Sequence, residues 1–171
     1  MNELELIRSQ LVAERNRATE VALMCVADAG TAALPARTAA SANDTRHDDV
    51  RQARTDYLVF VLTRFEERDQ MFAEVARAGS PASTAARQAL DETIARAGTS
   101  REALAKLEAA LAGAGSWRDF GDCIQGPWRA RRDAIDALQA ATARISDWRA
   151  VSFVDADSIL QERALYARVR P

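Results

Sequence analysis

The segment RFEERDQMF, residues 64–72, concentrates charged side chains that could hold a metal ion or an anion. It contains two arginines, one just before Phe65 and one between Phe65 and Phe72, and three acids between the two phenylalanines. Acids that gather on one side of a helix are candidate metal ligands, whereas arginines that point inward would bind a carboxylate or another anion. The chemistry of the segment therefore depends on which of its charges face the interior.

Helical periodicity separates these charges, because successive residues are rotated by about 100° around the helix axis. Counted from Tyr57, Arg68 falls in the middle of the apolar stripe and Arg64 falls at its near edge. Glu66 lies on the opposite side, and the other two acids lie on the flanks. The pattern predicts that arginines, rather than metal-binding carboxylates, point inward.

Buried arginines need carboxylate partners, because an unpaired buried charge costs several kcal/mol. Three predicted helices carry an adjacent Glu-Arg step near the middle of a face: Glu14-Arg15, Glu67-Arg68 and Glu162-Arg163. We expect Arg68 or Arg64 to pair with Glu14 or Glu162 between helices.

The predicted network includes three further side chains: Arg131, Tyr57 and Tyr166. Arg131 lies on the Ile135–Leu138 face of its predicted helix. Two alternatives stay open for the inward arginines. They could line a pocket that binds an anionic small ligand, or they could extend along an apolar groove and reach water at its edge.

The elements that must position these residues are almost all helical. Apolar residues recur at three- and four-residue spacing, which predicts long helices over residues 2–29, 44–78, 127–148 and 153–169. Short helices are predicted over 82–97 and 100–112, with a loop at 30–43 and an irregular segment at 116–126. We predict one all-α domain over 1–171, an antiparallel four-helix bundle with a pair of short helices inserted at about 80–126.

Composition excludes several classes of protein. The chain has 171 residues, 48% of them hydrophobic, and its formal net charge of −2 disfavours a nucleic-acid partner. Its first residues, MNELELIRSQ, carry acids where a signal peptide has basic residues, and no apolar run approaches the roughly 18 residues of a membrane span. We expect a cytoplasmic protein that does not enter a membrane and has no cofactor.

Cysteine and histidine offer little chemistry in this chain. Cys25 and Cys123 lie far apart without a CxxC pattern, so we expect reduced thiols with a structural role. Cys25 falls on an apolar helix face, which raises the pKa of a thiol instead of activating it. His47 is the only histidine and stands at a predicted helix start, so we assign no metal ligand and no catalytic residue.

Two stretches, YLVFVLTRFEERDQMF at 57–72 and DSILQERALYARVRP at 157–171, resemble helices of the bacterial hemerythrin-like (HHE) family. In the second stretch Asp157 stands where that family has a histidine, Gln161-Glu162 replaces an acidic pair, and Tyr166 matches an aromatic residue. The resemblance implies a four-helix bundle. The family's di-iron centre uses several histidines, so the single histidine here implies that the centre is lost and that Glu and Arg side chains occupy its place.

These observations favour a non-enzymatic, cytoplasmic helical bundle with a structural role or a role in protein interaction, built around a buried Glu/Arg network. A small-ligand-binding bundle and a degenerate hemerythrin-like metal-binding protein are the alternatives. Leu23, Leu58 and Leu62 lie off the main apolar stripes of their predicted helices. Trp148 lies opposite the apolar face of its predicted helix. A homodimer or another protein partner would cover such side chains.

Overall fold

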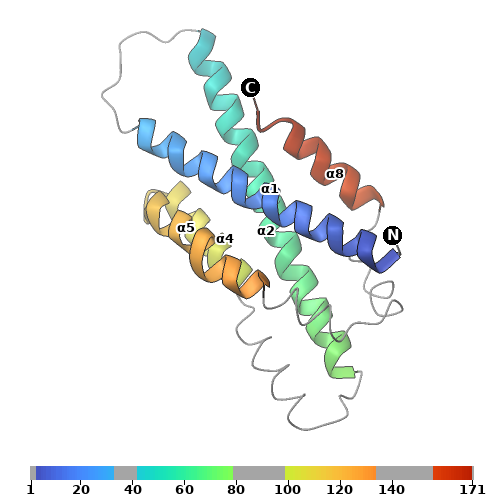
Figure 1. Ribbon diagram of the computed structural model, residues 1–171. Helices are drawn as coiled ribbons and strands as arrows, with labels where there is room; N and C mark the ends of the chain where they lie inside the picture. The colour runs from blue at the N-terminus through green and yellow to red at the C-terminus, as the bar shows by residue number, and fades with distance from the viewer. Residues whose placement is uncertain (1–2, 33–41, 79–98, 134–155, 171) are drawn as a thin grey trace.

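The computed structural model describes residues 3–32, 42–78, 99–133 and 156–170 (Figure 1). Within these ranges the chain is all-α and forms no strand, as the sequence predicted. The elements are α1 (Glu3–Ala32), α2 (Ala42–Ala78), α4 (Thr99–Leu111), α5 (Trp117–Cys123), the π-helical turn η1 (Ile124–Trp128) and α8 (Ala156–Ala167). The helical backbone continues from η1 through residues 129–133.

Helices α1 and α2 cross at the centre of the described structure, with α4 and α5 on one side and α8 on the other (Figure 1). Helix α2 contacts α1, α4 and α8, which explains why Leu58 and Leu62, although off its main stripe, are fully buried. The predicted antiparallel four-helix arrangement also involves residues 82–97 and 134–155, which lie outside the described ranges. It remains a prediction.

Large side chains from α1, α2, α4, α5 and η1 fill one hydrophobic core. Phe65 of α2 packs edge-on against Trp128, with ring centroids 5.6 Å apart. The indole Nε1 of Trp128 donates a hydrogen bond to the buried Ser100 hydroxyl at 3.1 Å. This bond satisfies the one polar atom that a buried tryptophan brings into an apolar core.

The segment predicted to be irregular, 116–126, is helical instead. The Ser116 hydroxyl accepts a hydrogen bond from the backbone N–H of Asp119 at 3.0 Å and so caps the start of α5. Burial of Phe120 outweighs the low helix propensity of the neighbouring glycine. Pro127 lies inside η1, not at a helix start, and the wider π-helical turn accommodates a residue that cannot donate a backbone hydrogen bond.

Two glycines lie at helix ends, and only Gly113 ends its helix as the sequence predicted. Gly113 closes α4 as predicted, with φ of 72°, and the following N–H of Ala114 bonds back to the Ala109 carbonyl at 2.9 Å. These features define a Schellman motif. Gly30, predicted to end the first helix, lies within its last turn, and α1 continues to Ala32.

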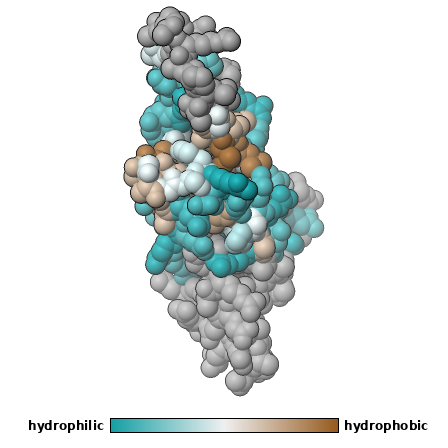
Figure 2. All heavy atoms as spheres, turned by 90° about the vertical axis from the view of Figure 1, so that its left-hand side faces the viewer, coloured by the Kyte–Doolittle hydropathy of each residue, from teal (hydrophilic) through white to brown (hydrophobic). Residues whose placement is uncertain are grey.

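The surface of the described residues mixes polar and apolar groups. Figure 2 shows apolar atoms gathered near the middle of one face, bordered by polar side chains. None of the described helices combines the length and the apolarity needed to cross a bilayer.

Candidate functional site

Glu162 of α8 is the most enclosed carboxylate among the described residues, with a relative exposure of 0%. Arg17 of α1 donates to both of its oxygens, from Nε and from Nη2, each at 2.8 Å. The Tyr57 hydroxyl of α2 donates to Oε1 at 2.6 Å. A bidentate arginine and a phenol together neutralise and solvate this buried anion. One side chain of α8 is thus bound by two other helices.

Glu14 of α1 is the second buried carboxylate and contacts both predicted arginines of α2. Arg68 Nη1 donates to Glu14 Oε2 at 3.1 Å, which confirms the expected pair. Arg64 Nε lies 3.7 Å from Glu14 Oε1, within ion-pair range. Arg64 also reaches α8, where its Nη1 donates to the Ser158 carbonyl at 2.6 Å. Residues 64–72 therefore supply two inward-facing cations, as the helical periodicity predicted.

A third buried pair joins α2 to the helix that follows η1. Arg132 Nη1 lies 2.7 Å from both carboxylate oxygens of Asp69. Helical periodicity placed Asp69 on a flank and predicted that Arg131 faces inward. Arg131 is instead half-exposed and pairs with Glu102 of α4 at 3.5 Å. From Phe120 onward, every fourth residue is buried: Ile124, Trp128 and Arg132. This spacing through the π-helical turn places Arg132 in the interior.

Aromatic rings surround the buried cations. Arg68 and Arg132 both lie over the Phe65 ring, with 5.6 Å and 4.7 Å between guanidinium carbon and centroid. Arg64 lies 5.1 Å from the centroid of Phe60. Cation–π attraction offsets part of the cost of dehydrating these guanidinium groups.

Tyr166 of α8 belongs to a more exposed extension of the network. Its hydroxyl donates to Glu20 Oε2 at 2.7 Å, and its ring lies 5.6 Å from that of Tyr57. Arg170 also binds Glu20. The hydrogen bond from Tyr166 is the main reason that the pKa of Glu20 lies below its ordinary value.

At the Glu14–Arg68 pair, two buried polar atoms make no hydrogen bond in the structure: Glu14 Oε1 and Arg68 Nη2. Both belong to side chains that are otherwise paired, so the charges compensate each other even where a hydrogen bond is missing. Burial lowers the pKa of Arg68, and the Glu14 carboxylate opposes this shift.

The thiols are buried and poorly suited to nucleophilic chemistry. Burial, followed by the charge of Asp28, raises the pKa of Cys25 to about 12. Burial is also the first cause that raises the pKa of Cys123, with Glu102 next. The expected direction is confirmed for Cys25, and Cys123 lies in a helix and not in the predicted irregular segment. His47 is exposed near the start of α2.

Metal-ligating side chains do not gather within the described ranges, where no three His, Cys, Asp or Glu residues form a cluster. The buried carboxylates instead lie beside arginines, whose positive charge repels a cation. Glu162, Glu14 and Asp69 are each engaged in ion pairs with arginines.

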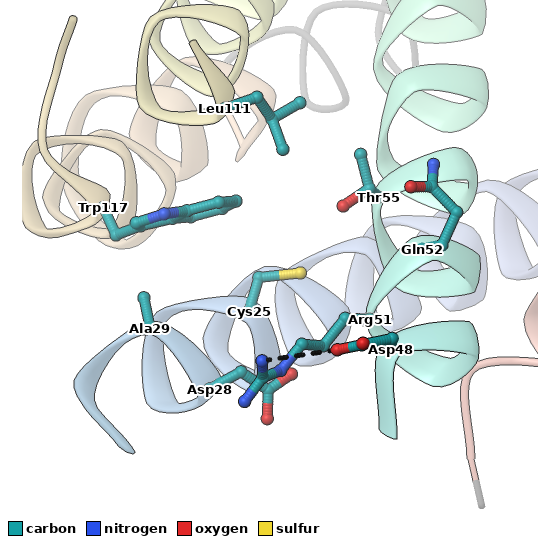
Figure 3. Close-up of a pocket in the computed structure, with 9 residues that line it drawn as sticks. All are labelled: Cys25, Asp28, Ala29, Asp48, Arg51, Gln52, Thr55, Leu111 and Trp117. Carbon is teal, nitrogen blue, oxygen red and sulfur yellow. Dashed lines mark ion pairs between the residues drawn. The ribbon is translucent and has the colours of Figure 1, made fainter. Parts of the chain in front are cut away.

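A pocket of about 380 Å³ lies apart from this network, between the C-terminal part of α1, the N-terminal part of α2, and the facing ends of α4 and α5 (Figure 3). It is lined by Cys25, Asp28, Ala29, Asp48, Arg51, Gln52, Thr55, Leu111 and Trp117. None of the predicted site residues lines it. The sequence gives no indication that three other helices leave a space beside the Trp117 ring.

Comparison of the chain with protein-family models, with curated proteins and with solved structures finds no match.

Proposed function

We propose that this chain is a non-enzymatic helical bundle whose role is structural or lies in protein interaction. In this proposal the long helices form an antiparallel four-helix arrangement in the cytoplasm. The buried ion pairs occupy the position that a di-iron centre has in hemerythrin-like proteins.

The full coordination of Glu162 carries this proposal. A catalytic carboxylate must keep an oxygen available to substrate, whereas Arg17 and Tyr57 occupy both oxygens of Glu162. All three side chains come from different helices, so the interaction fixes how these helices pack. Buried polar networks of this kind restrict a bundle to one arrangement.

Side chains on the outer face of α1 support an interaction role. Val12 and Leu23 are 38% and 37% exposed, and their spacing of eleven residues places them three turns apart on one side of the helix. Exposed apolar side chains on a shared face favour contact with another protein surface. We propose a second copy of the chain as the partner.

Sedimentation velocity over a dilution series tests this proposal. The unaltered protein should sediment as a dimer at high concentration, and the double variant Val12→Glu/Leu23→Glu should sediment as a monomer with an unchanged circular dichroism spectrum. Leu160→Glu is the matched control, because Leu160 is 64% exposed on α8 and lies on a different helix. A strict monomer at all concentrations would reject the homo-oligomer.

A further inference from the structure

The pocket beside Trp117 has two chemically different walls (Figure 3). Trp117, Leu111, Ala29 and the Cys25 thiol form the apolar wall, contributed by α1, α4 and α5. The polar wall consists of α2 side chains, among them Gln52 and Thr55, together with Asp28 of α1. A concave site with an aromatic wall and a few polar groups is the usual form of a small-molecule site, and about 380 Å³ lies within the range of such sites.

The indole of Trp117 presents the main contact surface of the apolar wall. Its ring extends across the space toward Cys25, and Leu111 lies above it in Figure 3. Phe120 contacts the indole edge-on, with ring centroids 6.1 Å apart. Because a neighbour fixes the ring, a planar ligand can stack on it without first ordering the side chain.

The charged side chains around the pocket neutralise each other. Asp28 is bound by Arg54, and Asp48 lies 3.8 Å from Arg51 across one turn of α2. Both acids of the lining therefore have a cation beside them. A charged ligand would have to compete with these pairs, so the lining favours an uncharged molecule.

Hydrogen-bonding groups on α2 define the polar end of the ligand. The Gln52 amide nitrogen already donates to Asp56 at 2.8 Å, which leaves its carbonyl oxygen as an acceptor. The Thr55 hydroxyl beside it can donate or accept. These groups match a ligand hydroxyl or N–H at one edge of a ring.

We propose that this pocket binds an uncharged, planar ring compound that carries one hydroxyl or N–H group. The ring stacks on Trp117, and its polar group bonds to Gln52 and Thr55. This site is separate from the ion-pair network and from the outer face of α1, so it does not depend on self-association.

Calorimetric titration with 2-naphthol tests the proposal, because this probe is an uncharged bicyclic ring with one hydroxyl at neutral pH. Naphthalene-2-sulfonate, an anion with the same ring, is the comparison. The unaltered protein should bind 2-naphthol saturably and the sulfonate at least about tenfold more weakly. Absence of saturable 2-naphthol binding, or equal binding of the sulfonate, would overturn the proposal.

Three variants locate the binding. Trp117→Leu should weaken 2-naphthol binding by about tenfold, because stacking is lost. Leu111→Arg offers a second test that leaves the core intact, since Leu111 is 47% exposed and a longer charged side chain there would obstruct the space. Leu160→Ala on α8 should bind as the unaltered protein does. Unchanged affinity in both pocket variants, with unchanged melting temperatures, would place the probe elsewhere and reject this site.

Discussion

Arg68 on α2 donates from Nη1 to Oε2 of Glu14 on α1 across 3.1 Å, and both side chains are buried. The two residues are 54 positions apart in the chain, so the pair joins helices that the sequence separates. Both side chains of this pair are shielded from water. Removing either one would leave the other charge buried and unpaired, which lowers the free energy of unfolding.

Replacing Arg68 by methionine should reduce the free energy of unfolding by about 3–5 kcal/mol, because Glu14 would keep a buried charge without its closest cation. Urea unfolding measures this change. The double variant Glu14→Leu/Arg68→Met should recover much of the loss, since it removes both charges. A shift in melting temperature of only a degree or two for Arg68→Met would show that the pair contributes little.

Tyr57→Phe should reduce the free energy of unfolding by about 1–3 kcal/mol, because buried Glu162 loses a hydrogen-bond donor at 2.6 Å. Tyr166→Phe is the matched control. It removes a hydroxyl from Glu20, which is 39% exposed and also bound by Arg170, so its effect should be smaller. An equal or larger effect of Tyr166→Phe would contradict the central position assigned to Glu162.

Alkaline pH should destabilise the fold through Cys25. Burial raises the pKa of this thiol from its ordinary value of 9.0 to about 12, so the folded protein retains a proton that the unfolded chain releases. The stabilising contribution is complete below pH 9 and is lost as the pH rises toward 12. In that interval the free energy of unfolding should fall by up to about 1.4 kcal/mol per pH unit on account of this group.

Urea unfolding at several pH values, repeated with Cys25→Ala, isolates this contribution. The variant should lose stability less steeply with pH than the unaltered protein. Above pH 10 the slope should steepen in both, because burial and Glu162 raise the pKa of Tyr57 above its ordinary value of 10.0. Identical slopes for the variant and the unaltered protein between pH 9 and 10 would refute the assignment to Cys25.

Gly121→Ala should destabilise the contact between α5 and α1 by about 1–3 kcal/mol, because an added Cβ would lie 2.9 Å from Val26 Cγ2. Gly126→Ala is the control, since a Cβ there meets no atom within 4 Å. Thermal unfolding of the two variants measures the difference. If both melt at the same temperature, the close packing at Gly121 has no energetic importance.

The sequence predicted the features that follow from helical periodicity. The long stripe of α2 indicated that Arg64 and Arg68 face inward, and the Glu-Arg steps indicated Glu14 as a partner. Arg17 was missed, although its position three residues after Glu14 on the same helix was a usable signal. Arg17 pairs with Glu162 because α8 lies beside it, and the periodicity of α1 gives no information on where α8 lies.

The remaining differences arise where packing between distant segments outweighs local preference. Helix α5 forms although Gly121 disfavours a helix, because Phe120 and the cysteine that ends it are buried. Asp69 and Arg132 are paired because η1 changes the spacing of inward residues, and a π-helical turn has no clear sequence signal. The pocket beside Trp117 depends on four helix segments, so no single stretch could predict it.

The π-helical turn η1 also determines where this chain tolerates a change in length. A π-helical turn contains one residue more than an α-helical turn of the same reach. Deleting one residue within Ile124–Trp128 would convert it to a regular α-turn and leave Arg132 directed at Asp69. The same deletion in the helix after the turn would rotate the residues beyond it by about 100° relative to α5. The turn is thus a site where the chain can be shortened without reorienting the surfaces on either side.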